Sequence, residues 1–183
     1  MTSLTLAAGV AVLMVPVAAS GAALTLGGPL SQLCYESALS RDSRNTSVES
    51  CSRSLQEESL TTPDRAATLV NRGILYMIRG STSKAEADFD AALKVDDGTP
   101  DAWLNKGFLR LRTGNGRDAL PLLEEGIKRQ PRRAALAYFA RGLAYEDMGN
   151  FSAAYSDLRR AQSLEPEWAL PTRYLARYQR RNR

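Results

Sequence analysis

The chain has 183 residues, a net charge of +4, no histidine and only two cysteines. Without histidine it cannot build a catalytic triad around an imidazole base, and two cysteines cannot supply a four-ligand Cys/His zinc site. The sequence also lacks a glycine-rich phosphate loop and the spaced carboxylates of a calcium loop. We therefore expect no enzymatic activity, no bound metal and no cofactor.

Residues 1–22 have the pattern of an export signal. Leu4 to Val17 is apolar at all but one position, and small residues follow it up to Ala23. The apolar run is short for a membrane span, and the small residues suit signal peptidase. We expect cleavage within Ser20 to Ala23 and a periplasmic or secreted protein. The alternative is an uncleaved anchor or an Ala/Gly tail, because no lysine or arginine precedes Arg41.

Residues 23–61 are expected to form a helical hairpin that departs from the repeats described below. The apolar pattern from Leu33 to Leu39 indicates a first helix. Thr46, followed three residues later by Glu49, predicts a capping box at the start of a second helix that runs to about Leu60.

Both cysteines lie in this hairpin, on either side of the expected loop near Ser43. Cys34 precedes Ser43 by nine residues and Cys51 follows it by eight, so an antiparallel hairpin places them opposite each other. A disulfide is the prediction for an oxidising compartment. In a reducing compartment the same positions would hold two small buried thiols.

The stretch from Ala66 to Trp168 repeats itself three times. Gly73, Gly107 and Gly142 follow one another at intervals of 34 and 35 residues. The same intervals separate two further sets of small residues: Ala85, Ala119 and Ala154, and Gly80, Gly114 and Gly149. Each unit reads as a helix, a glycine turn and a second helix, which cannot bury its apolar face alone. We therefore expect an all-α solenoid of stacked hairpins over residues 62–183.

Two helix starts within this array share one design, at Thr62-Pro63-Asp64 and Thr99-Pro100-Asp101. We expect threonine to cap the helix, proline to take the first helical position and aspartate to meet the positive end of the helix dipole. One inserted residue near Ala134 predicts an irregular junction before the third repeat.

A basic residue stands immediately before each repeat glycine. Arg72, Lys106 and Arg141 recur once per unit and could form a ladder for an anionic ligand. Such residues more often lay their stems over a neighbouring helix and pair with acids, here Asp88 or Asp157. We expect the structural role.

The final segment, from Trp168 onward, predicts a helix that covers the open end of the last repeat. Four residues can provide the apolar contact: Trp168, Tyr174, Leu175 and Tyr178. The opposite face is basic, with Arg173, Arg177, Arg180 and Arg181. This face could contact anionic lipid as a peripheral membrane site, an acidic protein or nucleic acid, or it could simply be solvated. Nucleic acid is the least expected ligand of an exported chain.

The clearest copy, Ala135 to Trp168, resembles the tetratricopeptide repeat (TPR) family. The family's large, small and terminating positions are matched by Tyr138, Gly142, Tyr145, Ala154, Leu158, Ala161 and Pro166. The chain thus resembles a small exported TPR protein of bacterial type. This resemblance implies a TPR-like α-solenoid of about three repeats, preceded by a degenerate hairpin and closed by a capping helix.

The resemblance also implies a function and a site. In TPR proteins the first helix of each repeat lines a concave groove that holds an extended peptide or a partner helix. The corresponding positions here are Val70, Ile74, Met77, Leu104, Asn105, Phe108, Leu111, Phe139 and Leu143. A clamp for a terminal carboxylate is not expected, because only Asn105 of its polar positions is retained. We expect a non-enzymatic interaction module that binds an apolar peptide or helix. One alternative is that the N-terminal hairpin or the last helix folds back and covers part of this groove. The other is a binder of envelope surfaces or nucleic acid that acts through the basic last helix.

Overall fold

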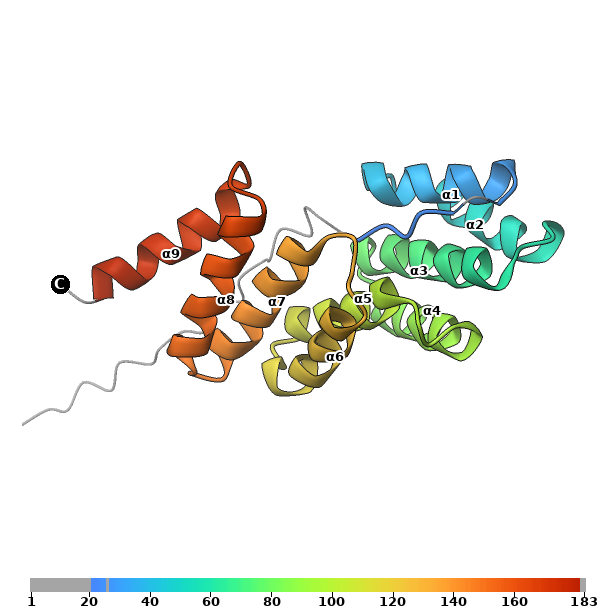
Figure 1. The fold of residues 1–183 in the computed structure, drawn as a ribbon. Coiled ribbons are helices and arrows are strands. Elements are labelled where there is room, and N and C mark those ends of the chain that lie inside the picture. The colour runs from blue at the N-terminus through green and yellow to red at the C-terminus, as the bar shows by residue number, and fades with distance from the viewer. Residues whose placement is uncertain (1–20, 26, 182–183) are drawn as a thin grey trace, which may run out of the picture.

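The computed structural model describes residues 21–25 and 27–181, with side chains described as far as residue 178, and helix is the regular structure throughout this part. The expected all-α fold is confirmed (Figure 1). The first hairpin consists of α1 (Pro29–Ser40) and α2 (Asn45–Glu57). The following elements are α3 (Thr62–Ile78), α4 (Thr82–Val95), α5 (Pro100–Arg112), α6 (Gly116–Lys128), α7 (Ala134–Asp147), α8 (Phe151–Leu164) and α9 (Ala169–Arg181).

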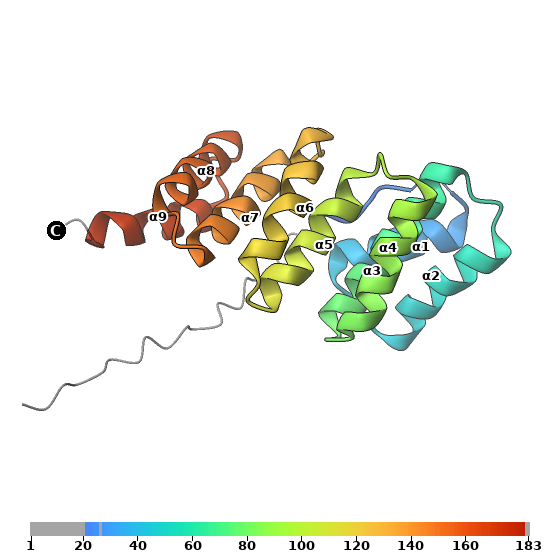
Figure 2. The same cartoon turned by 90° about the horizontal axis from the view of Figure 1, so that it is seen from below.

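The helices are stacked as a solenoid. The pairs α3–α4, α5–α6 and α7–α8 are the repeated hairpins, and Figure 2 shows them side by side along the array. The first helices also contact one another, α3 with α5 and α5 with α7, while each second helix packs against the next first helix. We call the side of α3, α5 and α7 that points away from α4, α6 and α8 the inner face.

The repeat glycines lie where the two helices of a hairpin cross. A β-carbon added to Gly73 would lie 2.5 Å from Cε1 of Phe89, and one added to Gly107 would lie 2.7 Å from Cδ2 of Leu123. Only glycine allows these helices to pack so closely. The turn glycines Gly80, Gly114 and Gly149 have φ values of 74°, 70° and 75°, the left-handed conformation that favours glycine.

The two expected threonine caps are only partly as predicted. In α3 the cap is Thr61, whose hydroxyl accepts a hydrogen bond from the Asp64 amide, so Thr62 already lies inside the helix. In α5 Thr99 is the cap residue, but its side chain makes no capping bond. Its hydroxyl instead donates to the Asp96 carboxylate at 3.2 Å. The prediction failed because adjacent threonines offered two registers and because a nearby acid competed for the hydroxyl.

The predicted capping box of α2 is wrong. The helix begins at Asn45 after Arg44, and the amides of Ser47 and Val48 donate to the Arg44 carbonyl. Thr46 therefore lies within the first turn, where it cannot act as the cap. The helix also ends at Glu57, before the predicted end at Leu60.

In α1, the leucines that indicated the helix lie on its outer side. Leu33 is 47% exposed and Leu39 57% exposed. The buried residues of α1 are instead small: Ser31, Cys34, Ser37 and Ala38. Small residues let α1 approach α2 and α3 closely.

The junction before the third repeat is irregular. Between α6 and α7, Gln130 adopts a φ of 54°, which is uncommon for a residue other than glycine. The predicted irregular junction is confirmed. Within residues 21–25 and 27–181, no helix is long and apolar enough to cross a membrane, and the rest of the expected export segment lies outside the described residues.

Candidate functional site

The inner face already holds an extended piece of this chain. The segment ahead of α1 runs along α3 toward α5 (Figure 1). The amide of Ala23 donates to Oδ1 of Asn71 at 2.9 Å, and Nδ2 of Asn71 donates to the Ala23 carbonyl at 2.8 Å. Asn71 is fully buried on α3. Because both bonds use main-chain groups of Ala23, Asn71 recognises an extended backbone rather than a particular side chain.

A second asparagine lies one repeat further along. Asn105 of α5 is fully buried, and its Nδ2 donates to the carbonyl of Gly21 at 3.4 Å and to that of Asp101 at 2.7 Å. Its Oδ1 is buried and has no hydrogen-bond partner among the described residues. At the other end of the segment, the Thr25 hydroxyl donates to Oδ1 of Asp64 at 3.2 Å. We call residues 21–25 the inner segment.

Asp101 completes the surroundings of Gly21. A β-carbon added to Gly21 would lie 3.1 Å from Oδ1 of Asp101, so this carboxyl group lies directly against the start of the inner segment. Burial raises the pKa of Asp101 to about 6, while the positive charges of Arg132 and Arg133 act in the opposite direction. Asp101 is thus a partly buried acid that lacks a strong counter-charge.

Most of the expected groove residues are buried by the neighbouring elements. The buried ones are Val70, Ile74, Met77, Leu104, Asn105, Phe139 and Leu143. Leu104 belongs to the core shared by α5, α6 and α7, and Val70 and Ile74 belong to a core that includes Ala23. Packing between neighbours therefore accounts for the apolarity of these positions. Phe108 and Leu111, on α5, remain partly exposed.

The last helix covers the end of the array as expected. The ring of Phe139 lies 4.9 Å from that of Trp168 and 5.1 Å from that of Tyr174, measured between centroids. Tyr174 and Leu175 are buried in the same core, against which Tyr178 also packs. These contacts close the exposed side of the third repeat.

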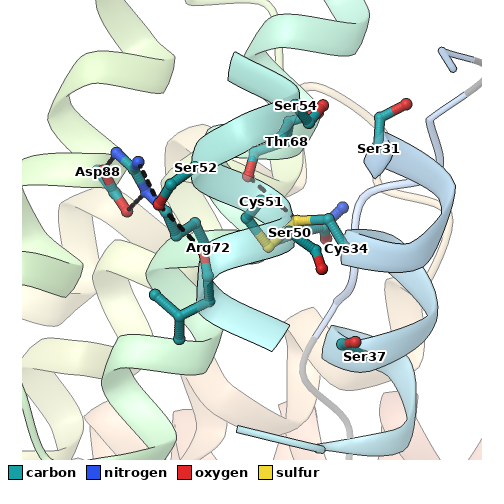
Figure 3. The surroundings of a disulfide bond; sticks show 12 residues. Ser31, Cys34, Ser37, Ser50, Cys51, Ser52, Ser54, Thr68, Arg72 and Asp88 are labelled. Carbon is teal, nitrogen blue, oxygen red and sulfur yellow. Dashed lines mark hydrogen bonds and ion pairs between the residues drawn. A yellow bond between two sulfur atoms is a disulfide. The ribbon is translucent and has the colours of Figure 1, made fainter. Parts of the chain in front are cut away.

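The disulfide between Cys34 and Cys51 is present, with 4.8 Å between the two Cα atoms. Both cysteines are fully buried, and Figure 3 shows them between α1 and α2 with Thr68 of α3 beside them. The structure thus contains the bridge expected in an oxidising compartment, where such bonds persist.

The basic residues before the repeat glycines are paired with acids, which confirms the structural role. Arg72 donates to both carboxylate oxygens of Asp88 at 2.8 and 2.7 Å and to Ser52 at 3.1 Å (Figure 3). Hydrogen bonding to Asp88 raises the pKa of Arg72. Arg141 makes the same bidentate contact in the third repeat, with Asp157.

In the second repeat, the basic residue before the glycine has a different ion-pair partner. The position equivalent to Asp88 in this repeat is Leu122, so Lys106 has no acid at the matching position of the second helix of its own hairpin. The Lys106 ammonium group instead pairs with Asp90 on α4 of the preceding repeat. The ion pair therefore links two repeats rather than the two helices of one repeat.

The basic face of α9 is only partly available. Arg177 donates to Oε1 of Glu146 at 3.1 Å and lies 4.9 Å from the centre of the Tyr174 ring, while Arg173 is exposed. The side chains of Arg180 and Arg181 lie outside the described part of the structure. Among the described residues, no cluster of three or more His, Cys, Asp or Glu side chains is placed to hold a metal ion.

Sequence reasoning missed Asn71 and the role of the inner segment. Asn71 and Asn105 are 34 residues apart, which is the repeat interval, so the spacing was a usable signal. The inner segment carries no such signal, because its first residues lie in the expected cleavage region and the others at the start of the hairpin expected over residues 23–61. Its partner Asn71 is 48 residues away in the sequence.

Comparison with known proteins finds one matching repeat and several similar folds. Residues 135–168 match the family described as "Tetratricopeptide repeat". Among solved structures, the chain is similar to the protein described as "MamA 41-end from Desulfovibrio magneticus RS-1", with a TM-score of 0.66 and 24% identity over 85% of this chain and 86% of that one. It is also similar to a crystal structure of MamA, with a TM-score of 0.61 and 19% identity over 78% of this chain and 80% of that one.

A human protein shows the same architecture. The first TPR domain of human RPAP3 has a TM-score of 0.59 and 22% identity, over 63% of this chain and 90% of that domain. No curated protein matches the chain by sequence. The likeness to these solved structures is one of fold.

Proposed function

We propose that the chain acts as an interaction module that binds an apolar segment of a partner protein on its inner face, because residues 135–168 match the tetratricopeptide repeat family and the fold is similar to that of MamA. Repeat solenoids present extended concave surfaces of this kind. In this proposal the module acts by binding rather than by catalysis.

One observation carries the proposal: the inner face already holds an extended stretch of polypeptide. Asn71 binds the main chain of Ala23 on both sides, and Asn105 binds the carbonyl of Gly21. Phe108 lies one helical turn beyond Asn105 on α5, and Leu111 lies a further turn on. These two partly exposed apolar residues continue the surface past the inner segment, so we assign them to the partner.

The proposal is tested by replacing Phe108 with glutamate and recovering partners by crosslinking in the native host. A charge at this position should abolish capture of partners that contact Phe108 in the wild type. Because Phe108 is only partly buried, the variant should keep its helical circular dichroism spectrum and lose about 1 kcal/mol of unfolding free energy.

The matched control is Leu39→Glu, which places the same charge at an apolar residue that is 57% exposed on the far hairpin. This variant should recover the same partners as the wild type. Partner capture by folded Phe108→Glu at the wild-type level would show that the partner binds elsewhere.

A further inference from the structure

We propose that Gly21 is the first residue of the mature protein and that Asp101 and Asn105 form a binding site for its α-ammonium group. The ligand is therefore part of this chain: the positively charged α-ammonium group that forms when the peptide bond before Gly21 is cleaved. The site is distinct from the partner surface at Phe108, and the proposal does not depend on that surface.

The hydrogen bonds of the inner segment repeat with the period of the solenoid. Asn71 binds both main-chain groups of Ala23, its nitrogen and its oxygen. Two residues earlier, which is the spacing of an extended strand, Asn105 binds the oxygen of Gly21. The structure holds no bond between the nitrogen of Gly21 and Oδ1 of Asn105, but the same pattern assigns that oxygen as the acceptor for an ammonium group formed there.

That acceptor has no partner among the described residues, although it is buried. A buried amide oxygen without a donor costs free energy, and such atoms are uncommon in folded proteins. An ammonium group at Gly21 has three N–H donors, whereas a peptide nitrogen there has one. It can satisfy Asn105 and still donate to a second acceptor.

Asp101 supplies the second acceptor and the opposite charge. Its Oδ1 lies 3.1 Å from where a β-carbon of Gly21 would be, and no hydrogen bond to its carboxylate occurs within the described residues. The cations that act on Asp101 are Arg132 and Arg133, yet burial prevails and its pKa remains raised. An adjacent ammonium group would stabilise the ionised form of this acid.

The sequence around Gly21 suits the required cut. Cleavage before Gly21 places Ser20 and Ala18 at the last and third-last positions of the removed peptide, where signal peptidase needs small residues. Cleavage one residue later would remove the carbonyl group that Asn105 binds. The small residues allow several cuts, and the contacts of the inner segment select this one.

The first test uses protein purified from the native host. Intact mass and labelling of the α-amino group should identify Gly21 as the first residue. The carboxylate should raise the pKa of this amine above the usual value of about 8 and so slow its reaction with an acylating reagent at pH 7. Asp101→Asn should speed this reaction about tenfold, since one pKa unit is a tenfold change in free amine.

The control is Asp118→Asn, which removes an acid from the first turn of α6 as Asp101→Asn does from α5. It should leave the labelling rate unchanged. A mature chain that starts at Met1 or at any residue other than Gly21 would overturn the proposal. So would equal labelling rates for the wild type and folded Asp101→Asn.

A second measurement requires no substitution. In wild-type protein that starts at Gly21, NMR titration should give Asp101 a pKa well below 6, because the ammonium group favours the carboxylate. Acetylation of the α-amino group removes that charge and should return the pKa of Asp101 to about 6. An identical Asp101 titration before and after acetylation would exclude the ammonium site.

Discussion

At the scale of single residues, the helix pair of the first repeat is held by close packing of its two helices and by an ion pair between them. Gly73 lets α3 pack onto the Phe89 ring, while the preceding Arg72 reaches Asp88 on the same partner helix. The side chain of Asp88 is 8% exposed and that of Arg72 21% exposed, so their bidentate geometry offsets the cost of removing both charges from water. Two adjacent residues, Arg72 and Gly73, thus provide the ion pair and the close packing between α3 and α4.

Replacing Gly73 with alanine should destabilise the protein by about 2 kcal/mol, as measured by urea unfolding. The new methyl group would lie 2.5 Å from the fully buried Phe89 ring, and this clash outweighs the better helix propensity of alanine. Gly98→Ala is the control, because the added carbon meets only the Asp96 side chain in a turn. It should change stability by less than about 0.5 kcal/mol. Equal effects of the two substitutions would contradict the close-packing explanation.

At the scale of elements, one carboxylate joins the end of α2 to the start of α1. The cap residue of α1, Gly28, offers no side chain, and Glu58 replaces it by accepting the amides of Leu30 at 2.8 Å and Ser31 at 3.0 Å. The Ser54 hydroxyl donates to the same carboxylate at 2.7 Å. Burial acts to raise the pKa of Glu58, but these hydrogen bonds outweigh it and the pKa is lowered.

Glu58→Gln should therefore lower the unfolding free energy by about 1 kcal/mol at pH 7, the usual value of a helix cap. A lowered folded-state pKa means that this stability is present above the unfolded value of about 4.3 and is lost as pH falls through the folded value. Urea unfolding at pH 7 and pH 3 should show the wild type and Glu58→Gln converging at the lower pH. A difference that persists unchanged at pH 3 would exclude the carboxylate cap.

The control for this experiment is the adjacent residue. Glu57→Gln removes a carboxylate that pairs only with the exposed Arg53 one turn away. Solvent screens such an exposed pair strongly, so this variant should differ little from the wild type at either pH.

At the scale of the whole molecule, the two ends of the array are secured by different means. The disulfide ties α1 to α2, and at the other end the aromatic residues of α9 pack against Phe139. In a solenoid each unit contacts its neighbours, so stability is approximately a sum of local contributions. Damage at one end should therefore remain near that end.

Tyr174→Ala should cost about 3 kcal/mol at the C-terminal end, because this side chain is 8% exposed and packs on Phe139. Hydrogen exchange should accelerate in α7 to α9 and stay unchanged in α1 and α2. Cys34→Ser/Cys51→Ser, which removes about 3 kcal/mol of chain-entropy stabilisation, should produce the opposite pattern. Faster exchange along the whole array in either variant would show that the solenoid unfolds as one unit.

The sequence by itself determined the helices, the repeat and the disulfide partners. Small residues at a fixed interval locate every helix crossing, as at Gly73 and Gly107, because the physical demand is local and recurs in each unit. Cys34 and Cys51 could be paired because they belong to one hairpin and lie at similar distances from its loop. Helix caps were less predictable, since Thr61 and Thr62 were equally suitable by sequence.

Only the tertiary structure decided which inner-face residues are available. Ile74 and Phe108 occupy the same repeat position, yet Ile74 is fully buried and Phe108 partly exposed. Their exposure differs because different neighbouring segments pack on the two residues, and the repeat period does not predict those neighbours. The position of the inner segment is likewise decided by the tertiary structure. Ala23 reaches Asn71 across 48 residues through its main-chain N–H and C=O groups, which every residue type except proline possesses. Hydrogen bonds made by the backbone of a segment leave no side-chain pattern in its sequence, so only the tertiary structure identifies them.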